Sequence, residues 1–232
     1  NKMGLDSSKK YQLFIDADSR LISDRFLKNY LSLASGGCVL CGGTAYSDKK
    51  PDDLRKMLRW KYGHMREAVP AKTRTSKKGF IISSNNFLID RDLFKKIHFR
   101  EEIRSYGHED TLLGFDLFSY GAEPLHIDNP VEHTGIEDSD VFLKKTEDAM
   151  KNLLIITKFA GENLPILKKS VTFLKKYEKL TLLINPELIS WFFKRIRGSL
   201  EKHLTGKNPR LFIFDLYKSG YFAKISLQEE HK

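Results

Sequence analysis

Two kinds of hydrophobic pattern divide this chain of 232 residues, and their order constrains the fold more than any other feature of the sequence. Up to about residue 135, short apolar runs such as residues 11–15 alternate with helical patterns such as residues 23–33. From about residue 139 only helical patterns remain. This order predicts an α/β core over residues 1–138, followed by a helical C-terminal extension over residues 139–232.

The individual elements follow from the same patterns. Strands are expected where short apolar runs end in glycine or in polar turns, at residues 11–15, 38–41, 80–82, 87–89 and 125–127. Helices are expected at residues 23–33, 51–67, 91–97, 109–120, 139–160, 164–180, 186–205 and 209–220. Residues 70–79 contain four basic side chains and no core pattern, so they are predicted to form a polar loop.

Positive charge is concentrated in the last third of the chain. Residues 1–150 contain 24 Lys and Arg against 23 Asp and Glu, whereas residues 151–232 contain 16 against 7. A basic appendage of this kind favours anionic partners such as phospholipid surfaces or phosphorylated substrates. Its aromatic residues follow helical periodicity, which favours packing over base stacking, so nucleic acid is not expected as a partner.

The helix expected at residues 186–205 has an apolar side. Trp191, Phe192, Ile196 and Leu200 are predicted to lie near one of its faces, with the basic residues largely elsewhere. This face either packs on the rest of the protein or lies on an anionic membrane surface. The sequence has no apolar run of 18 residues, so no transmembrane segment is expected.

Cys38 and Cys41 form a Cys-x-x-Cys pair inside an apolar strand pattern. Such a pair can be redox-active or half of a metal site, but the sequence offers no second Cys/His pair at zinc spacing. Two reduced core cysteines are therefore expected, which fits a reducing cytoplasm.

Asp16 and Asp18 follow the strand expected at residues 11–15. Because side chains alternate along a strand, both carboxylates are expected to point the same way. Two neighbouring carboxylates repel each other unless a cation lies close by, and oxygen ligands suit Mg²⁺ or Mn²⁺, which bind phosphate oxygens. The tripeptide is common, so two solvated acids in a turn are the alternative.

Glu109 and Asp110 open the helix expected at residues 109–120. Acids at this position either complement the helix dipole or provide a general base for a hydroxyl group. His126 and His133 are further candidates for a cation site, because imidazole suits Mn²⁺. His126, inside an apolar strand, is interpreted as a core histidine, whereas His133, in a loop, stays open between ligand and surface residue.

Five motifs then occur in a particular order. They are Asp16-Ala17-Asp18 after an apolar strand, the glycine-flanked strand at residues 38–41, residues 84–94, residues 107–114, and residues 129–133. In this order and spacing, residues 5–155 closely resemble the GT-A family 2 glycosyltransferases of bacteria, including those that build capsules and lipopolysaccharides. The resemblance implies a GT-A (Rossmann-like) mixed sheet. It also implies inverting, metal-dependent transfer of a sugar from a nucleoside-diphosphate sugar, first of all a UDP-sugar, to a hydroxyl of a saccharide or lipid-linked acceptor.

The resemblance implies roles for individual acids. Asp18 corresponds to a ligand of Mn²⁺ or Mg²⁺, and His133 to the late metal-binding histidine of the family. Asp16 corresponds to a supporting residue near the ribose or the metal. Asp110 corresponds to the catalytic base, with Glu109 as the other candidate.

The resemblance also implies contacts with the two substrates. Asn85 and Asn86 occupy the turn that lines the donor sugar and the acceptor, and His108 belongs to the same donor and acceptor set. Residues 70–79 take the place of a mobile loop over the nucleotide diphosphate. The basic residues of this loop either help to neutralise the diphosphate or are simply solvated; they are Lys72, Arg74, Lys77 and Lys78.

One departure from the family concerns the start of the chain. Family members have a strand and a nucleotide-base pocket well before the Asp-x-Asp strand, which here begins around residue 11. The sequence therefore predicts an N-terminally incomplete core, and residues 1–232 alone are expected to be inactive or unstable. A catalytically incomplete transferase-like scaffold, or an anion- or polysaccharide-binding module, is the alternative function.

The expected location is the cytoplasm, with peripheral contact at the inner face of the plasma membrane, while the sugar, linkage and oligomeric state stay open.

Overall fold

The computed structural model describes residues 1–76, 80 and 82–230, the side chain of Glu230 excepted. The described chain is mixed α/β, with two mixed sheets and a helical C-terminal region, so the predicted fold class is confirmed at this level.

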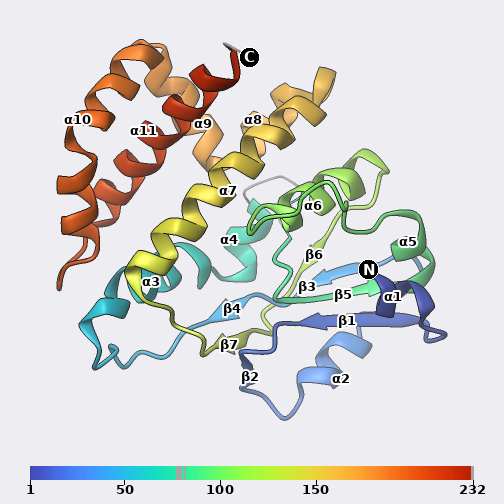
Figure 1. Ribbon diagram of the computed structural model, residues 1–232. Helices are drawn as coiled ribbons and strands as arrows, with labels where there is room; N and C mark the ends of the chain where they lie inside the picture. The colour runs from blue at the N-terminus through green and yellow to red at the C-terminus, as the bar shows by residue number, and fades with distance from the viewer. Residues whose placement is uncertain (77–79, 81, 231–232) are drawn as a thin grey trace. The chain divides into compact units, whose positions relative to one another are not determined.

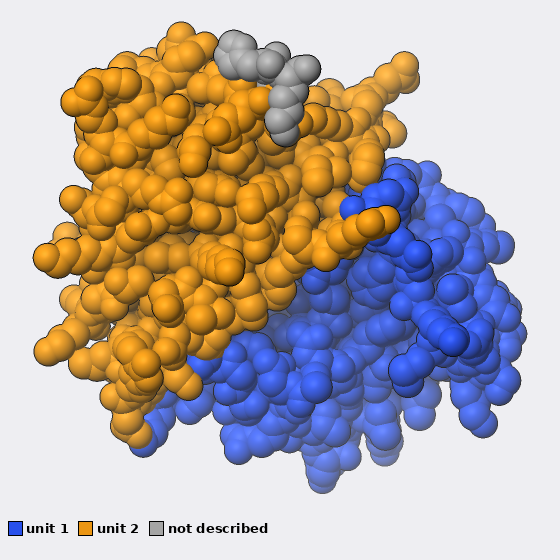
Figure 2. All heavy atoms as spheres, in the orientation of Figure 1, with its two compact units in different colours: residues 1–49, 63–102, 109–136 blue, residues 50–62, 103–108, 137–232 orange. Residues whose placement is uncertain are grey.

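Its contacts divide it into two compact units, coloured separately in Figure 2. The first unit is Asn1–Lys49, Gly63–Glu102 and Glu109–Ile136, and the second is Lys50–Tyr62, Ile103–His108 and Glu137–Lys232. Two short segments before the predicted boundary at residue 138 thus belong with the C-terminal helices.

The first unit contains both sheets (Figure 1). Its strands are β1 (Tyr11–Ile15), β2 (Ser19–Leu21), β3 (Val39–Cys41), β4 (Thr44–Ala45), β5 (Asn86–Asp90), β6 (Leu125–His126) and β7 (Val131–His133). Its helices are α1 (Lys2–Asp6), α2 (Phe26–Leu31), α4 (Ala71–Ser76), α5 (Arg91–Lys96) and α6 (Glu109–Ser119), with a π-helical turn at Gly63–Glu67.

The larger sheet has the strand order β1-β5-β3-β6. β5 is antiparallel to both β1 and β3, whereas β3 and β6 are parallel. The carboxyl ends of β1, β3 and β6 therefore lie at the same edge of the sheet as the beginning of β5. At this edge the N–H of Gly42 donates to the carbonyl of Asn86 (3.1 Å) and the N–H of Asp16 donates to that of Asn85 (3.3 Å).

Side chains that alternate along these strands build a core on each face of the sheet. On one face, residues of β3 and β5 pack against α5 and α6; this cluster includes Val39, Cys41, Phe87, Ile89, Leu93, Phe94, Leu113 and Leu117. On the other face, Leu40 and Leu88 pack against Phe26 and Tyr30 of α2. Because the strands are buried on both faces, they read in the sequence as continuous apolar runs.

The smaller sheet has the order β2-β7-β4. β7 is antiparallel to β2, with Ser19 opposite His133, and parallel to β4, with Thr44 opposite Val131. None of these three strands was predicted, because two or three residues are too short for a periodic pattern. Their pairing nevertheless decides which residue lies beside the acids after β1.

The second unit is helical. It contains a 3₁₀ turn at Leu54–Lys56 and another at Gly161–Asn163, together with α3 (Met57–Tyr62), α7 (Ser139–Phe159), α8 (Leu164–Ser170), α9 (Thr172–Thr181), α10 (Pro186–Leu204) and α11 (Leu211–Glu230). The single helix predicted at residues 164–180 is wrong, because Val171 adopts an extended conformation and separates α8 from α9. The last helix is longer than predicted, since the sequence after Gly220 continues without a terminating residue.

Aromatic side chains hold α3, α7 and α11 together. The ring centroid of Phe142 on α7 lies 5.3 Å from that of Tyr62 on α3 and 5.4 Å from that of Phe214 on α11. α10 packs on α11 at Gly220, where a Cβ atom would overlap the ring of Phe193. None of the helices in the described part of the chain is long and apolar enough to cross a membrane.

The predicted loop at residues 70–79 is wrong for its first part, which forms α4. Only Ala71 of this helix is buried, so the sequence has no apolar periodicity that would predict a helix here. Hydrogen bonds hold it instead: the N–H of Ala71 donates to the carboxylate of Asp128 (2.7 Å). Lys77 and Lys78 lie outside the described residues, as does residue 81 of the strand expected at 80–82, and residues 80 and 82 are not in a strand.

Candidate functional site

The segment Asp16-Ala17-Asp18 connects β1 to β2. Because β2 pairs with β7, Asp18 lies beside His133, with 3.4 Å between Asp18 Oδ1 and His133 Nδ1. The side chain of Asp18 is 45% exposed and that of His133 is 12% exposed. The structure thus brings together two residues predicted as metal ligands from opposite ends of the first unit's sequence.

Two neighbours of His133 in the sequence fix the position of Asp18. The N–H and the hydroxyl of Thr134 both donate to the backbone carbonyl of Asp18, at 2.9 and 2.6 Å. A Cβ atom on Gly135 would overlap the carboxylate of Asp18. A side chain at position 135 would therefore displace the Asp18 carboxylate, a constraint that no sequence motif indicates.

Tyr46 orients the imidazole of His133. The ring centroids lie 5.5 Å apart in an edge-on arrangement, and the hydroxyl of Tyr46 hydrogen-bonds the carboxylate of Glu67. Neither Tyr46 nor Glu67 was predicted to belong to the site. No motif marks them, because their positions depend on the pairing of β4 with β7.

The acids of this corner repel each other. The pKa of Asp16 is raised above its ordinary value, first by burial and then by the charge of Asp18, and the charge of His133 opposes the shift. A cation would relieve this repulsion. Cis ligands of an octahedral ion at about 2.1 Å lie about 3 Å apart, close to the separation of Asp18 Oδ1 and His133 Nδ1.

Asp18 and His133 therefore fit a Mn²⁺ or Mg²⁺ ion, but they do not enclose one. Among the residues that the structure describes, no group of three or more His, Cys, Asp or Glu is arranged to hold a metal. Mg²⁺ is commonly bound by one or two carboxylates, with water and substrate phosphates completing its shell. The donor set at this corner suits that kind of open, substrate-completed site.

A turn at residues 83–86 lies between the two acidic motifs. On one side, the carbonyl of Asn85 accepts a hydrogen bond from the N–H of Asp16 (3.3 Å). On the other, the N–H of Ser84 lies beside the carboxyl of Asp110 and stabilises its charged form. Acids that are far apart in the sequence are thus supported by two consecutive residues of one turn.

Asn85 and Asn86 have different surroundings. Asn85 is half-buried, and its amide group exchanges hydrogen bonds with the hydroxyl of Thr44 (2.9 and 3.2 Å). Asn86 is fully buried: its Nδ2 donates to the carbonyls of Gly43 and Asn129, and its Oδ1 accepts from the hydroxyl of Tyr30 (2.6 Å). Asn86 therefore fixes the ends of the strands and has no polar atom left for a sugar.

Asp110 and Glu109 begin α6. The carboxyl of Asp110 is half-buried but set deep among protein atoms, and this burial, with the charge of Glu109, raises its pKa to about 7. The N–H of Thr111 donates to Asp110 Oδ1 (2.6 Å) and limits the shift. Within the described chain, the buried Oε2 of Glu109 has no hydrogen-bond partner. A carboxyl with a pKa near neutrality thus lies next to an acceptor oxygen that has no hydrogen-bond partner in the described chain.

The loop before these acids is strained. Gly107 has φ 98° and His108 has φ 67°, and His108 is the only non-glycine residue with positive φ in the described part of the chain. Both belong to the second unit, where the Nδ2 of Asn152 on α7 donates to the carbonyls of Ser105, Tyr106 and Gly107 (3.0, 3.2 and 2.7 Å). Burial, with a further effect of the Lys218 charge, lowers the pKa of His108 to about 4. Strain of this kind is often found at functional sites.

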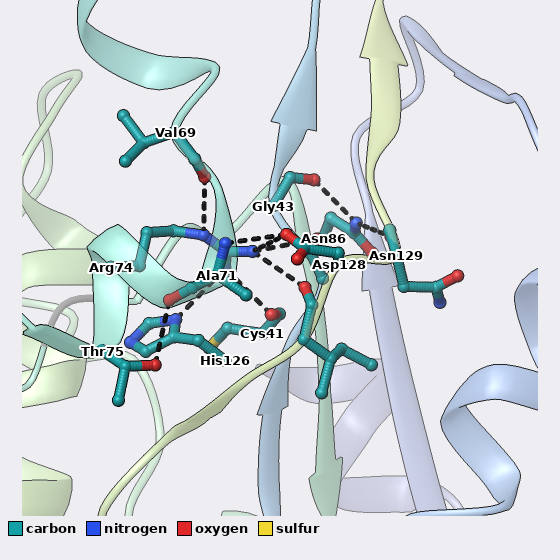
Figure 3. Close-up of polar contacts among 12 residues, drawn as sticks. Cys41, Gly43, Val69, Ala71, Arg74, Thr75, Asn86, His126, Asp128 and Asn129 are labelled. Carbon is teal, nitrogen blue, oxygen red and sulfur yellow. Dashed lines mark hydrogen bonds and ion pairs between the residues drawn. The ribbon is translucent and has the colours of Figure 1, made fainter.

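Arg74 was expected in a loop over the diphosphate, but its guanidinium is not free to bind one. All five of its N–H groups are used: they donate to the carbonyls of Val69, Cys41, Gly42 and Ile127 and to Nδ1 of His126 (Figure 3). Burial lowers its pKa, and Asp128 lies 4.0 Å away. Arg74 thus holds together the carboxyl ends of β3 and β6. Lys72, on the same helix, is exposed.

His126 and the cysteines have the structural roles that were expected. His126 is buried, and burial together with the charge of Arg74 lowers its pKa to about 4. Cys38 and Cys41 are both free thiols, and burial raises the pKa of Cys41 to about 12. A thiol with so high a pKa is a poor nucleophile, so the Cys-x-x-Cys pair belongs to the core.

Comparison of the sequence with models of known protein families, and with curated proteins, found no match.

Proposed function

We propose that this chain is the metal-binding and catalytic part of an inverting glycosyltransferase that uses a nucleoside-diphosphate sugar. The observation that carries the proposal is the turn at residues 83–86, which supports Asp16 through Asn85 and Asp110 through Ser84. A transferase needs a cation-binding corner for the diphosphate and a base for the acceptor within one site. The two motifs gathered at this turn supply residues suited to each.

The proposed fold is GT-A, of the family 2 type, built on the mixed sheet. Ligands of open α/β sheets bind outside the carboxyl ends of the strands. The candidate acids lie at that edge, after β1 and beside the beginning of β5. The motif order over residues 5–155 is the second support for this assignment.

The proposed cofactor is Mn²⁺ or Mg²⁺. Asp18 and His133 would hold it, with Asp16 in support, and oxygens of the donor diphosphate would complete its coordination. When bound, such an ion stabilises the negative charge that develops on the leaving diphosphate. Tyr46 and Gly135 would keep the two ligands in place.

Asp110 is proposed as the base. The acceptor oxygen attacks the anomeric carbon on the face opposite the diphosphate, and the hydroxyl proton passes to the carboxylate of Asp110. The bond between the anomeric carbon and the diphosphate oxygen breaks, and its electron pair leaves with the diphosphate. A pKa of about 7 keeps a large share of Asp110 ionised at neutral pH while leaving it basic enough to accept the proton. Glu109, with its unpartnered Oε2, is the second candidate.

The proposed donor is a UDP-sugar and the proposed acceptor a saccharide or lipid-linked hydroxyl, in the cytoplasm. Asn85 is the proposed residue for contact with the donor sugar or the acceptor. His108 precedes the acids in the sequence and is proposed to shape the acceptor side through its strained backbone. Arg74 and Asn86 are proposed to act only by fixing the strand ends.

Calorimetric titration of the protein with UDP, in the presence of Mn²⁺ and after chelation, tests the cation-binding half of the proposal. Binding is expected to depend on Mn²⁺ and to weaken by about tenfold or more in Asp18→Asn and His133→Gln, since each removes one ligand. Asp24→Asn, an exposed acid elsewhere in the first unit, is the matched control. An affinity for UDP that changes neither with Mn²⁺ nor with these substitutions would contradict the proposed cation site.

Transfer or hydrolysis of the UDP-sugar tests the catalytic half. Asp110→Asn is expected to leave metal-dependent UDP binding intact and to lower kcat by about 100-fold or more, because a general base contributes about that much. A Glu109→Gln variant that loses the rate while Asp110→Asn keeps it would move the role of base to Glu109.

A further inference from the structure

Large apolar side chains are exposed together in the second unit, where α9 ends and α10 begins. They are Leu182, Leu183, Ile184, Leu188, Trp191 and Phe192, here called the apolar patch. Leu182 and Leu183 are 81% and 85% exposed. Large apolar side chains exposed this close together in the chain indicate a surface that binds another protein or a membrane.

The apolar patch does not lie on the face by which α10 packs against the other helices. α10 carries a second apolar face, formed by Phe193, Leu200 and Leu204, and this face is buried. The ring of Phe193 lies 5.4 Å from that of Tyr217 on α11. Leu200 was predicted to share a face with Trp191, which is wrong, because the two side chains lie on the buried and exposed sides of the helix. α10 thus packs in the second unit through a different face from the one that contains Leu188 and Phe192.

A cationic groove adjoins the apolar patch. It has a volume of about 1050 Å³ and is lined by residues of α7, α10 and α11, among them Trp191 of the patch. Figure 1 shows where these three helices lie. Four lysines line it: Lys151, Lys158, Lys194 and Lys224. Lys151 pairs with Asp148 (2.8 Å) and Lys158 with Glu229 (2.9 Å).

The other two lysines lack such partners. No carboxylate in the part of the chain that the structure describes pairs with Lys194 or Lys224, although Glu187 and Glu229 also line the groove. Next to them, the guanidinium of Arg195 lies 4.6 Å from the centroid of the Trp191 ring. Lys224 lies over the ring of Tyr221 (5.9 Å), so the groove and its rim offer cations without a carboxylate partner close to aromatic rings.

This combination indicates what covers the surface. Tryptophan and phenylalanine bordered by lysine and arginine suit the boundary between lipid headgroups and acyl chains, and the excess positive charge of residues 151–232 suits an anionic leaflet. A second copy of the chain fits less well. A two-fold interface on this surface would bury the charges of Lys194 and Arg195 of both copies between two surfaces of the same positive sign.

We propose that the apolar patch inserts into the headgroup layer of an anionic bilayer while Lys194 and Lys224 bind the phosphate of a lipid headgroup. The surface is distinct from the candidate catalytic residues, and the proposal does not depend on glycosyl transfer. It assigns membrane contact to residues 182–192 rather than to the face of α10 that contains Leu200.

Co-sedimentation of the protein with phosphatidylcholine vesicles, with and without phosphatidylglycerol, tests this proposal. Vesicles with phosphatidylglycerol are expected to bind at least about tenfold more tightly, because the lysines of the groove are attracted to an anionic surface. The double variant Leu182→Ser/Leu183→Ser is expected to lose about tenfold or more in binding. The double variant Lys194→Glu/Lys224→Glu is expected to lose the preference for phosphatidylglycerol.

Met3→Ser/Met65→Ser is the matched control, because these two side chains are exposed apolar groups in the first unit. It is expected to bind vesicles like the unaltered protein, and circular dichroism checks that every variant keeps its helical content. Equal binding of neutral and anionic vesicles, or unchanged binding by Leu182→Ser/Leu183→Ser, would overturn the proposal. So would a stable dimer that the leucine variant dissociates, since a second copy would then cover the patch.

Discussion

At the scale of single residues, the surroundings of a side chain decide its chemistry. Asp18 and Asp110 are both aspartates next to another acid, but Asp18 is 45% exposed and lies beside an imidazole, whereas Asp110 lies deep beside Glu109. Arg74 shows the same principle. Its guanidinium is saturated by backbone carbonyls and an imidazole, so a basic residue expected to bind phosphate instead links two strands.

The raised pKa of Asp110 has a consequence for stability. Burial and the charge of Glu109 raise this pKa from 3.8 to about 7, so between these pH values the folded protein keeps a proton that the unfolded chain has lost. The free energy of unfolding therefore falls as the pH rises through this window. Asp110→Asn stays neutral, so it should stabilise the protein at pH above 7, by on the order of 2–4 kcal/mol, and should have little effect near pH 4.

Thermal unfolding of the two proteins across this pH range measures the difference. Asp24→Asn, which replaces an exposed acid, should show no such trend. A difference between Asp110→Asn and the unaltered protein that does not grow with pH would mean that Asp110 is already ionised at low pH in the folded state.

At the scale of elements, short connections hold the candidate site more than the long helices do. The turn at residues 83–86 contacts both acidic motifs, and the loop at residues 105–107 is held by one asparagine of α7. Asn152 is buried, its Oδ1 accepts from the hydroxyl of Ser105 (2.7 Å), and its Nδ2 donates to three carbonyls. A single side chain thus fixes the backbone that leads into Glu109.

Asn152→Ala should loosen this loop. The substitution leaves three carbonyls without their donor, and the free energy of unfolding should fall by about 1–3 kcal/mol. Trypsin should cleave faster after Arg104, which is exposed in the same loop, and mass spectrometry of the digest measures this rate. Lys144→Ala, at an exposed position of α7, is the control. Equal cleavage rates in Asn152→Ala and the control would show that the loop is held by other contacts.

At the scale of the whole molecule, the two units are not separated in the sequence. The chain passes between them repeatedly, and α3 belongs with α7 although about 80 residues lie between them, a separation that costs little extra loop-closure entropy. Arg59 on α3 lies 3.9 Å from Glu137 and stacks on the ring of Phe142 (5.2 Å), and the N–H of Leu58 donates to the hydroxyl of Ser139 (3.4 Å).

A fragment that ends at Asp138 should therefore not fold independently. It would keep α3 but lose α7, and it would expose Met57 and Leu58, which are buried in the complete chain. Sedimentation and circular dichroism should find this fragment aggregated or without a cooperative unfolding transition, in contrast to residues 1–232. A monomeric, cooperatively folded fragment would show that residues 50–62 do not need the C-terminal helices.

The sequence by itself determined the elements that have a strong hydrophobic period. The strand at residues 11–15, the helix that begins at Glu109 and the long helices after Ser139 were all predicted, because each has enough residues to display a hydrophobic period. Asp16 and Asp18 were predicted to point the same way by alternation along a strand. That basis is wrong, because β1 ends at Ile15 and both acids lie in the turn before β2.

Tertiary structure alone decided which residues meet. The pairing of Asp18 with His133, the close approach at Gly135, the saturation of Arg74 and the exposure of the apolar patch all depend on strand order or on packing between distant segments. The contacts of Arg74 are made mainly to backbone carbonyls, which every residue type has, so no sequence pattern indicates them. The hydrophobic period of a helix or strand depends only on the order of its own side chains. The residues that meet across the sheet are fixed only when distant strands pair.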